Sequence, residues 1–272
     1  MKSRITFDGI TLLHYAQYTT VDFWTEAHHS HDHCEIFLHE QGTLTVLVED
    51  TVYRHNGKEI RIYAPGELHF GRAERDQYME WYQISLPRSF FERHAPLGRI
   101  LDRPHGVGNV FVCQRHDELV ALAREIFQKK EECSPLTEAY FHANIERILC
   151  LLGEGEQQAG APSEEHDVLQ DVLSQINEHF RSLHTLEDLS SLVHYAPSYL
   201  HRLFRERLQT TPHRYIQTKR LTHAKNRLAA GASVADACED AGFESYPNFI
   251  TLFRKTYGIT PKKFQAQCLP RS

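Results

Sequence analysis

The chain of 272 residues is long enough for two domains, and 41% hydrophobic with 24% charged residues is ordinary for a globular protein. No apolar run approaches the roughly 20 residues of a membrane span. The six cysteines stand far apart without a Cys-x-x-Cys pair, which argues against a disulfide framework or a zinc ribbon. No apolar segment follows Met1 as in a secretory signal, so a cytoplasmic protein is expected.

The net charge of −6 is divided unevenly along the chain. Residues 1–166 hold 16 basic and 26 acidic residues, a net charge of −10, whereas residues 167–272 hold 14 and 10, a net charge of +4. A basic terminal domain can contact phosphates while an acidic one stays clear of the duplex. The asymmetry therefore favours DNA binding by the second part of the chain.

The first 115 residues predict an all-β sandwich or barrel. Short alternating runs over 43–48, 59–63 and 78–85 are separated by Gly- and Pro-containing turns. One of these turns is followed by His69, and the segment before the runs reads His29-x-His31-x3-Glu35. Because side chains alternate along a strand, the histidines and glutamate of this segment share one face.

Three imidazoles and a carboxylate that converge inside a barrel suit a divalent metal such as Fe, Mn, Zn or Ni. Inward polar residues also bind an organic ligand or one another, so both interpretations stay open. The arrangement resembles the cupin motifs, with Ala64 and Ala73 where a proline and an asparagine are usual. No separate acid, base or nucleophile is marked, so no enzymatic activity is expected. The predicted metal ligands are His29, His31, Glu35 and His69, and the predicted effector pocket comprises Trp24, His29, His31, His33, Glu35, Phe37, His69 and Trp81.

Two helices are predicted next, over 117–130 and 137–152, from apolar residues at helical spacing. Their hairpin either covers the first domain or pairs with a second subunit. A homodimer is expected because a symmetric dimer can occupy tandem DNA sites. The following residues, 153–166, contain Gly and Pro but almost nothing that can be buried, which predicts a flexible linker. Domains are therefore expected over 1–152 and 167–272.

The last hundred residues contain one helical pattern twice. The first copy opens at Thr185 with Thr-x-x-Asp and the second at Ser233 with Ser-x-x-Asp, each an N-cap with a carboxylate in the first turn. Each copy then reads as helix, tight turn and helix, which predicts a tandem helix-turn-helix module along DNA. A helix from Pro212 towards Gly231 joins the copies; its about 19 residues span roughly 28 Å, close to the roughly 34 Å of one DNA turn.

The second helix of each copy has a buried stripe and an outward face. Outward Arg202 is expected to bond a guanine edge, and Asn248 to pair with adenine. The alternative is a merely solvated helix surface. The predicted DNA-binding residues are Ser198, Tyr199, His201, Arg202 and Arg205 in the first copy, and Tyr246, Asn248, Ile250, Thr251, Arg254 and Lys255 in the second, the last two nearer the backbone.

The second copy and its tail, residues 241–264, together with Arg220-Leu221-x2-Ala224, resemble the AraC family of bacterial transcription regulators. The resemblance covers about the whole chain, because many members carry an N-terminal cupin-like effector domain. It implies an α+β protein of two domains: a cupin-like β-barrel with a helical hairpin, and an all-α tandem helix-turn-helix domain. Three positions depart from the family pattern: Ala196 stands at a cap that is commonly Ser or Asn, Gln209 replaces Gly, and Thr251 replaces Arg.

The expected function is sequence-specific, effector-controlled regulation of transcription. Its expected partners are double-stranded DNA, a small-molecule effector that the resemblance suggests is a sugar, a second subunit, and RNA polymerase; no cofactor is required. One alternative is a cupin metalloenzyme with a degenerate helical appendage. Another is a ligand-buffering protein that binds DNA only nonspecifically.

Overall fold

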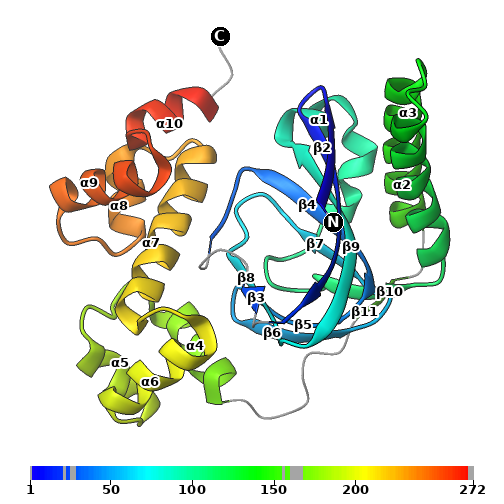
Figure 1. Cartoon of the computed structure of the whole chain (residues 1–272). Helices are drawn as coiled ribbons and strands as arrows, with labels where there is room; N and C mark the ends of the chain where they lie inside the picture. Colours follow the sequence, from blue (N-terminus) through cyan, green and yellow to red (C-terminus); the bar gives the residue numbers. More distant parts are fainter. Residues whose placement is uncertain (1, 21–22, 25–28, 155–156, 160–167, 269–272) are drawn as a thin grey trace. The chain divides into compact units, whose positions relative to one another are not determined.

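The computed structural model describes residues 2–20, 23–24, 29–154, 157–159 and 168–268 (Figure 1). The chain divides into two compact units, residues 1–25 with 31–165, and residues 26–30 with 166–272. They are called here the N-terminal unit and the C-terminal unit. None of the helices in the described part is long and apolar enough to cross a membrane.

The N-terminal unit is built on two antiparallel sheets, which confirms the predicted β-rich domain. Among the described residues the large sheet has the strand order β1-β2-β9-β4-β7-β10-β11 and the small sheet the order β3-β8-β5-β6. The strands are β1 (Lys2–Phe7), β2 (Ile10–Thr19), β3 (Phe23–Trp24), β4 (His33–Gln41), β5 (Thr43–Val48), β6 (Thr51–Asn56), β7 (Ile60–Tyr63), β8 (His69–Ala73), β9 (Gln77–Pro87), β10 (Val110–Cys113) and β11 (Gln157–Ala159).

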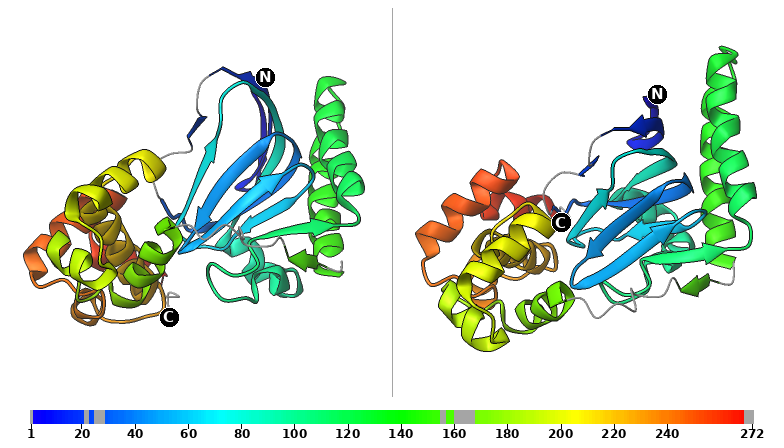
Figure 2. Two further views of the ribbon diagram at one scale, coloured as in Figure 1. Left: turned by 90° about the horizontal axis from the view of Figure 1, so that it is seen from below. Right: turned by 60° about the horizontal axis from the view of Figure 1, so that its bottom comes forward.

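The large sheet buries both of its faces, each against a different layer. On one face, aliphatic residues such as Ile36 and Ile84 share a core with helices α2 and α3. On the other, Tyr63 and Trp81 pack with Val46 of the small sheet, so the two sheets lie face to face. Both views in Figure 2 show α2 and α3 along one side of the large sheet.

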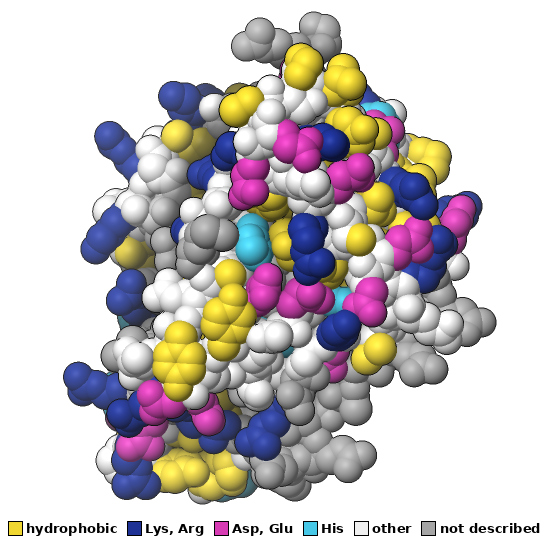
Figure 3. Space-filling view, turned by 45° about the vertical axis from the view of Figure 1, so that its right-hand side comes forward, with side chains coloured by type: hydrophobic (Ala, Val, Ile, Leu, Met, Phe, Trp, Pro, Cys, Tyr) yellow, Lys and Arg dark blue, Asp and Glu magenta, His cyan; other side chains and the backbone are white. Residues whose placement is uncertain are grey.

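Helices α2 (His116–Glu131) and α3 (Thr137–Glu154) confirm the predicted hairpin. Their apolar residues are buried in the core of their own unit. The surface on the side of α2 and α3 in Figure 1 mixes acidic and basic side chains with separate apolar ones (Figure 3). The exposed residues of the hairpin include Ala121, Arg124 and Gln128 on α2 and Ala139, Ala143 and Arg147 on α3. Two short helices before them, α1 (Arg88–Arg93) and the 3-10 helix η1 (Ala95–Leu101), carry no sequence signal that we identified.

The flexible linker predicted over 153–166 is wrong in part. Helix α3 continues to Glu154, and Gln157–Ala159 form β11, which pairs antiparallel with β10. The exposed backbone groups of an edge strand can pair with almost any extended segment. Pairing of this kind needs no apolar side chains, so composition could not reveal it.

The C-terminal unit is all-helical, as predicted, with two clusters of short helices joined by one long helix. Helix α7 (Pro212–Ala229) runs between the clusters, and its 18 residues span about 27 Å (Figure 1). At one end lie α4 (Val168–His179), α5 (Leu186–Val193) and α6 (Pro197–Leu208); at the other lie α8 (Val234–Asp240), α9 (Tyr246–Tyr257) and α10 (Pro261–Cys268). Sequence analysis missed α4, although its buried Leu169, Val172, Leu173 and Ile176 have helical spacing.

Helix caps follow the sequence closely. Thr185 forms a complete capping box with Asp188, and the Ser233 hydroxyl accepts a hydrogen bond from the backbone N–H of Asp236. Ala196, as expected, provides no side-chain cap. Gln209 ends α6 in the left-handed conformation, with φ 49° and ψ 30°, which is the conformation that glycine supplies elsewhere.

The Gln209→Gly substitution is therefore expected to raise the free energy of unfolding by about 0.5–1 kcal/mol, because it relieves the steric cost of a Cβ at positive φ. Urea denaturation followed by far-UV circular dichroism measures the change. Gln209→Ala retains the Cβ and is the control. An equal gain in both variants would show that the side chain, and not the backbone conformation, is responsible.

Candidate DNA-binding interface and effector pocket

Helix α6 presents the outward face that its sequence predicts. Leu200, Leu203, Phe204 and Leu208 are buried against the unit's own core. Ser198, His201, Arg202 and Arg205 are exposed, and Tyr199 is half-buried. The Pro197 ring stands in the first turn, where a missing N–H leaves no intrahelical bond unmade.

Aromatic rings beside Arg202 restrict where its guanidinium can lie. The guanidinium carbon is 5.5 Å from the centroid of the Tyr199 ring, and that ring lies 5.3 Å from Tyr195. The Ser190 hydroxyl donates a 2.7 Å hydrogen bond to the Tyr195 carbonyl, which ties the turn to α5. No described carboxylate forms an ion pair with Arg202. Its charge and its planar set of donors remain available to DNA.

Helix α9 presents a similar but less basic face. Tyr246, Asn248, Thr251, Arg254 and Lys255 are exposed as predicted. Ile250 differs: it is half-buried and packs against the core that contains Phe249 and Phe253. Ile250 lies at the border of the buried stripe, where apolar contact with the neighbouring helices outweighs exposure. The Thr251 hydroxyl donates a 2.9 Å hydrogen bond to the Pro247 carbonyl, within the helix itself.

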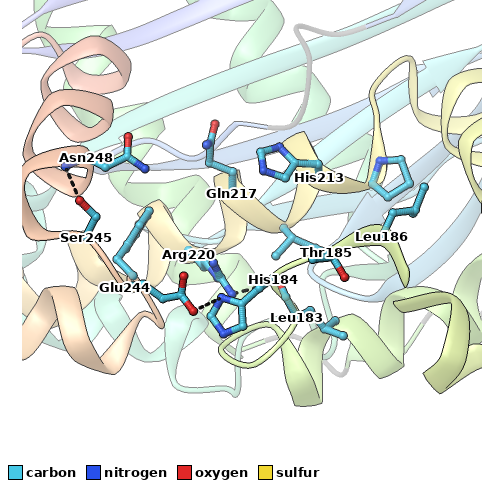
Figure 4. Close-up of a pocket in the computed structure, with 13 residues that line it drawn as sticks. Leu183, His184, Thr185, Leu186, His213, Gln217, Arg220, Glu244, Ser245 and Asn248 are labelled. Atoms are coloured by element: carbon cyan, nitrogen blue, oxygen red, sulfur yellow. Dashed lines mark hydrogen bonds and ion pairs between the residues drawn. The ribbon is translucent and has the colours of Figure 1, made fainter. Parts of the chain in front are cut away.

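A cleft of about 180 Å³ lies between the two helix-turn-helix motifs (Figure 4). His213, Gln217 and Arg220 of α7 line it, together with the starts of α5 and α9. Beside Arg220, the imidazole of His184 forms a 3.4 Å ion pair with the carboxylate of Glu244. This contact crosses from one motif to the other.

Arg220 connects α7 to the loop between α4 and α5. Its Nε donates to the Phe180 carbonyl at 2.8 Å, and one Nη donates to the carbonyls of Arg181 and Leu183 at 3.1 and 3.0 Å. All three accepting carbonyls belong to the loop that follows α4, so these bonds hold that loop against α7. The sequence marked Arg220 only through the family resemblance, and the structure gives its physical role.

Gly242 packs directly against the same loop. It has φ +75°, and a Cβ placed on it would lie 2.3 Å from the carbonyl oxygen of Arg181 and 2.6 Å from its Cα. No side chain fits there. The turn between α8 and α9 and the loop between α4 and α5 therefore touch through backbone, across the two motifs.

In the N-terminal unit, Glu35 is the centre of a polar cluster on the inner face of the large sheet. Its carboxylate lies 3.2 Å from Nε2 of both His31 and His33, 3.9 Å from Nε2 of His69, and accepts a 2.8 Å hydrogen bond from Gln83. Burial alone would raise the pKa of Glu35, but the hydrogen bonds and charges of the histidines reverse this and hold the pKa well below its usual range. Glu35 is an anion at neutral pH.

The tautomers of His31 and His69 are set by backbone carbonyls. Nδ1 of His31 lies 2.8 Å from the His33 carbonyl, and Nδ1 of His69 lies 3.0 Å from the Glu67 carbonyl. A carbonyl only accepts, so each Nδ1 carries the proton and each Nε2 faces Glu35. Histidines that ligate metals are held in this way. The same geometry also suits an imidazolium that donates to the carboxylate.

A cavity of about 370 Å³ opens beside this cluster. Strands β1, β2 and β9 line it with Arg4, Thr11, Leu13, Gln83 and Ser85, and His33 closes one side. Hydroxyl, amide and imidazole groups around an open space of this size are typical of a small-molecule pocket. Sequence analysis identified His33 but missed the other residues, because isolated polar residues in strands look like solvent-facing positions.

The remaining predicted pocket residues have different outcomes. Phe37 and Trp81 lie between the sheets, in or against the interior core. Trp24 occupies a position in β3 opposite Arg72, and its side chain lies outside the described residues. His29 belongs to residues 26–30, which cluster with the C-terminal unit, so its place among the ligands stays a prediction.

Comparison with known proteins matches both units. The family model of the AraC-like ligand binding domain matches residues 11–143, and that of a helix-turn-helix domain matches residues 189–267. The chain is 25% identical over 248 residues to the HTH-type transcriptional regulator YisR of Bacillus subtilis. The aligned residues make up 83% of this chain and 83% of YisR. It is 26% identical to the probable transcriptional regulator LumQ of Photobacterium leiognathi, over 89% of this chain and 92% of that protein.

The HTH-type transcriptional activator RhaR of Cronobacter sakazakii is 22% identical over 89% of this chain and 87% of its own length. A crystal structure of ToxT from Vibrio cholerae aligns with 96% of this chain and 99% of its own, at 12% identity and a TM-score of 0.40. The relatives named here are transcription regulators and not enzymes. The chain belongs to the AraC family of DNA-binding transcription regulators, with a ligand-binding domain ahead of its helix-turn-helix domain.

Proposed function

We propose that the protein binds a specific promoter sequence through α6 and α9 and that a small molecule in the N-terminal unit controls this binding. The observation that carries the proposal is the exposed face of α6, where Arg202 has no carboxylate partner among the described residues and stands beside Tyr199. An arginine in this position can bond both acceptors of a guanine in the major groove. We also propose that α6 and α9 enter successive major grooves, because the length of α7 between them is close to one turn of DNA.

The Arg202→Ala variant is expected to lose about 1–3 kcal/mol of its preference for the cognate site over random DNA, roughly 5- to 150-fold in relative affinity. The cognate site is obtained by selection from random DNA, and fluorescence anisotropy measures both affinities at one salt concentration. Lys255→Ala is the control, since a phosphate contact should weaken binding to all sequences alike. Unchanged discrimination in Arg202→Ala would refute the proposed role of α6.

The proposed effector site is the cavity beside Glu35 together with the interior between the sheets. Its hydroxyl and amide groups support a sugar or a related polyhydroxy compound. A ligand that binds only the folded protein raises its melting temperature. Binding of such a compound should also change the affinity for the selected DNA, and a compound that binds without this change is no effector.

A divalent metal in the histidine cluster is a separate proposal, and DNA binding needs none. The Nε2 atoms of His31 and His69 and the carboxylate of Glu35 would hold it, with His29 as the further predicted ligand. The fixed tautomers support this assignment. Elemental analysis of purified protein should then find about one Fe, Mn, Zn or Ni, and His31→Ala should lose it. Protein that is fully active and free of metal would contradict the proposal.

Dimerisation is also proposed, through the outward face of α2 and α3. The apolar residues of this hairpin are already buried in its own unit, so the contact would use small and polar residues such as Ala121, Ala143 and Arg147. Light scattering after size exclusion measures the mass. Ala143→Glu should shift a dimer to the monomer, and a monomeric wild-type protein would refute the proposal.

A further inference from the structure

Basic side chains gather in the interior of the N-terminal unit, apart from the histidines that contact Glu35. His39 and His55 are fully buried, Arg61 is 3% exposed, and His116 is 4% exposed. They come from β4, β6, β7 and the start of α2. None of them was singled out by the sequence, because each stands alone in an otherwise apolar or mixed run.

Arg61 lies on the inner face of the large sheet and has few partners. Its guanidinium carbon is 4.4 Å from the centroid of the Phe37 ring, and one Nη is 3.5 Å from the Tyr63 hydroxyl. Its Nε is buried without a hydrogen-bond partner. Within the described residues no carboxylate forms an ion pair with this guanidinium. One long hydrogen bond leaves most of the five N–H donors of a buried cation unused.

The carboxylates near Arg61 contact other side chains. The Glu59 carboxylate contacts the His55 imidazole, and the Glu40 carboxylate lies 3.5 Å from Nδ1 of His116. Partly buried Arg103 shows the usual solution: it forms a 2.7 Å ion pair with fully buried Glu67 and donates to backbone carbonyls as well. Taking a charge out of water without such a partner costs several kcal/mol. A negative charge supplied from outside would offset this cost at Arg61.

His39 adds a second, different requirement. Its Nε2 lies 3.0 Å from the Gly42 carbonyl, so Nε2 donates and Nδ1, which is buried without a partner, carries the lone pair. Burial, together with the nearby charges of His55 and Arg61, lowers the pKa of His39 to about 2, so the ring is neutral at pH 7. A neutral Nδ1 accepts a hydrogen bond. A ligand that meets both groups needs an anionic end for Arg61 and a hydroxyl for His39.

We propose that Arg61 binds the carboxylate of the effector and His39 accepts a hydrogen bond from a hydroxyl of the same molecule, so that the effector class is a hydroxy acid such as a sugar acid. The proposal rests on the proposed function only in assuming that the N-terminal unit holds the effector. Phe37 and Trp81 supply ring faces beside the two polar groups; the Trp81 ring is parallel to His39 at 6.2 Å. The proposal narrows the sugar that the family resemblance suggests to an acidic one.

The test uses the full chain and four matched pairs in which an alcohol replaces the carboxylate: glucuronate and glucose, galacturonate and galactose, lactate and 1,2-propanediol, 3-hydroxybenzoate and 3-hydroxybenzyl alcohol. Thermal unfolding is followed at constant ionic strength. At least one acid should raise the melting temperature in a saturable manner while its alcohol does not. If no acid exceeds its alcohol, the proposal is overturned; stabilisation by chloride or phosphate to the same extent would show an adventitious ion only, and would overturn it too.

Two variants assign the effect to Arg61. Arg61→Met should lose the response to the acid, at least tenfold in affinity, and without ligand should unfold no more easily than the wild type, because an uncompensated buried charge is removed. A less stable Arg61→Met protein would show that the guanidinium is structural. Arg54→Met, an exposed arginine on β6, should keep the response. Arg202→Ala should also keep it, so failure of the DNA-binding proposal and failure of this one are observed separately.

Discussion

Gly242→Ala is expected to lower the free energy of unfolding of the C-terminal unit by about 3 kcal/mol, because the new methyl meets backbone and has no open direction. A residue with a Cβ at φ +75° costs about 1–2 kcal/mol, and the 2.3 Å approach to the Arg181 carbonyl adds a cost on the scale of an overpacked core, about 1–3 kcal/mol. Arg181 cannot simply move aside, since its carbonyl is held by Arg220.

Urea denaturation with two probes measures this prediction. Both tryptophans, Trp24 and Trp81, belong to the N-terminal unit. The urea midpoint of their fluorescence should therefore stay unchanged, whereas the midpoint of the helical circular dichroism signal should shift to lower urea concentration. Gly258→Ala is the matched control: Gly258 has φ +76° but nothing within 4 Å of a Cβ, so it reports the backbone cost alone. An equal loss in the two variants would rule out the clash with Arg181.

Arg220→Met is expected to destabilise the same unit by about 3 kcal/mol. Three hydrogen bonds from one charged group to carbonyls would be lost, and hydrogen bonds to charged groups each contribute about 1.5–3 kcal/mol in favourable cases. We expect less than their sum because Arg220 is half-exposed. Arg220→Lys should recover only part of the loss, because an ammonium cannot reproduce the fixed fork of the guanidinium.

The control for Arg220 is Arg227→Met on the same helix. Arg227 is exposed and pairs with Asp240 at 2.7 Å, and surface pairs of this kind contribute about 0–1 kcal/mol. Circular dichroism against urea measures both variants. A loss at Arg220 no larger than at Arg227 would mean that water replaces the three hydrogen bonds. Combined with Gly242→Ala, Arg220→Met should cost less than the two separate losses together, since both act on one loop.

Local signals in the sequence predicted most of the helical unit. The caps at Thr185 and Ser233, the proline at the start of α6 and the buried stripes of α6 and α9 all lie within one or two turns of chain. Helical periodicity can be read from such short segments. Ile250 was assigned to the outward face but is half-buried, because periodicity alone cannot decide a residue at the border of a stripe.

Contacts between distant segments were not predictable. The partners of Arg220 are backbone carbonyls about 40 positions away, and a carbonyl leaves no mark in the sequence. The strand β11 forms through backbone pairing for the same reason. In the β-rich unit, Arg61 belongs to a predicted strand, but which face it occupies and what surrounds it depend on the pairing of β7 with β4. A slip of one residue in this pairing would move every side chain of β7 to the opposite face.

The backbone contact at Gly242 and the three bonds of Arg220 fix one short loop between both reading motifs. These contacts should prevent the two helix-turn-helix motifs from moving independently about α7. The DNA-binding domain would then act as one rigid body. When a stiff protein meets two major grooves that are out of alignment, the duplex must bend or twist to reach it, and the energy of that deformation depends on the bases between the contacted sites. Selectivity would thus extend to intervening base pairs that no side chain of the protein touches.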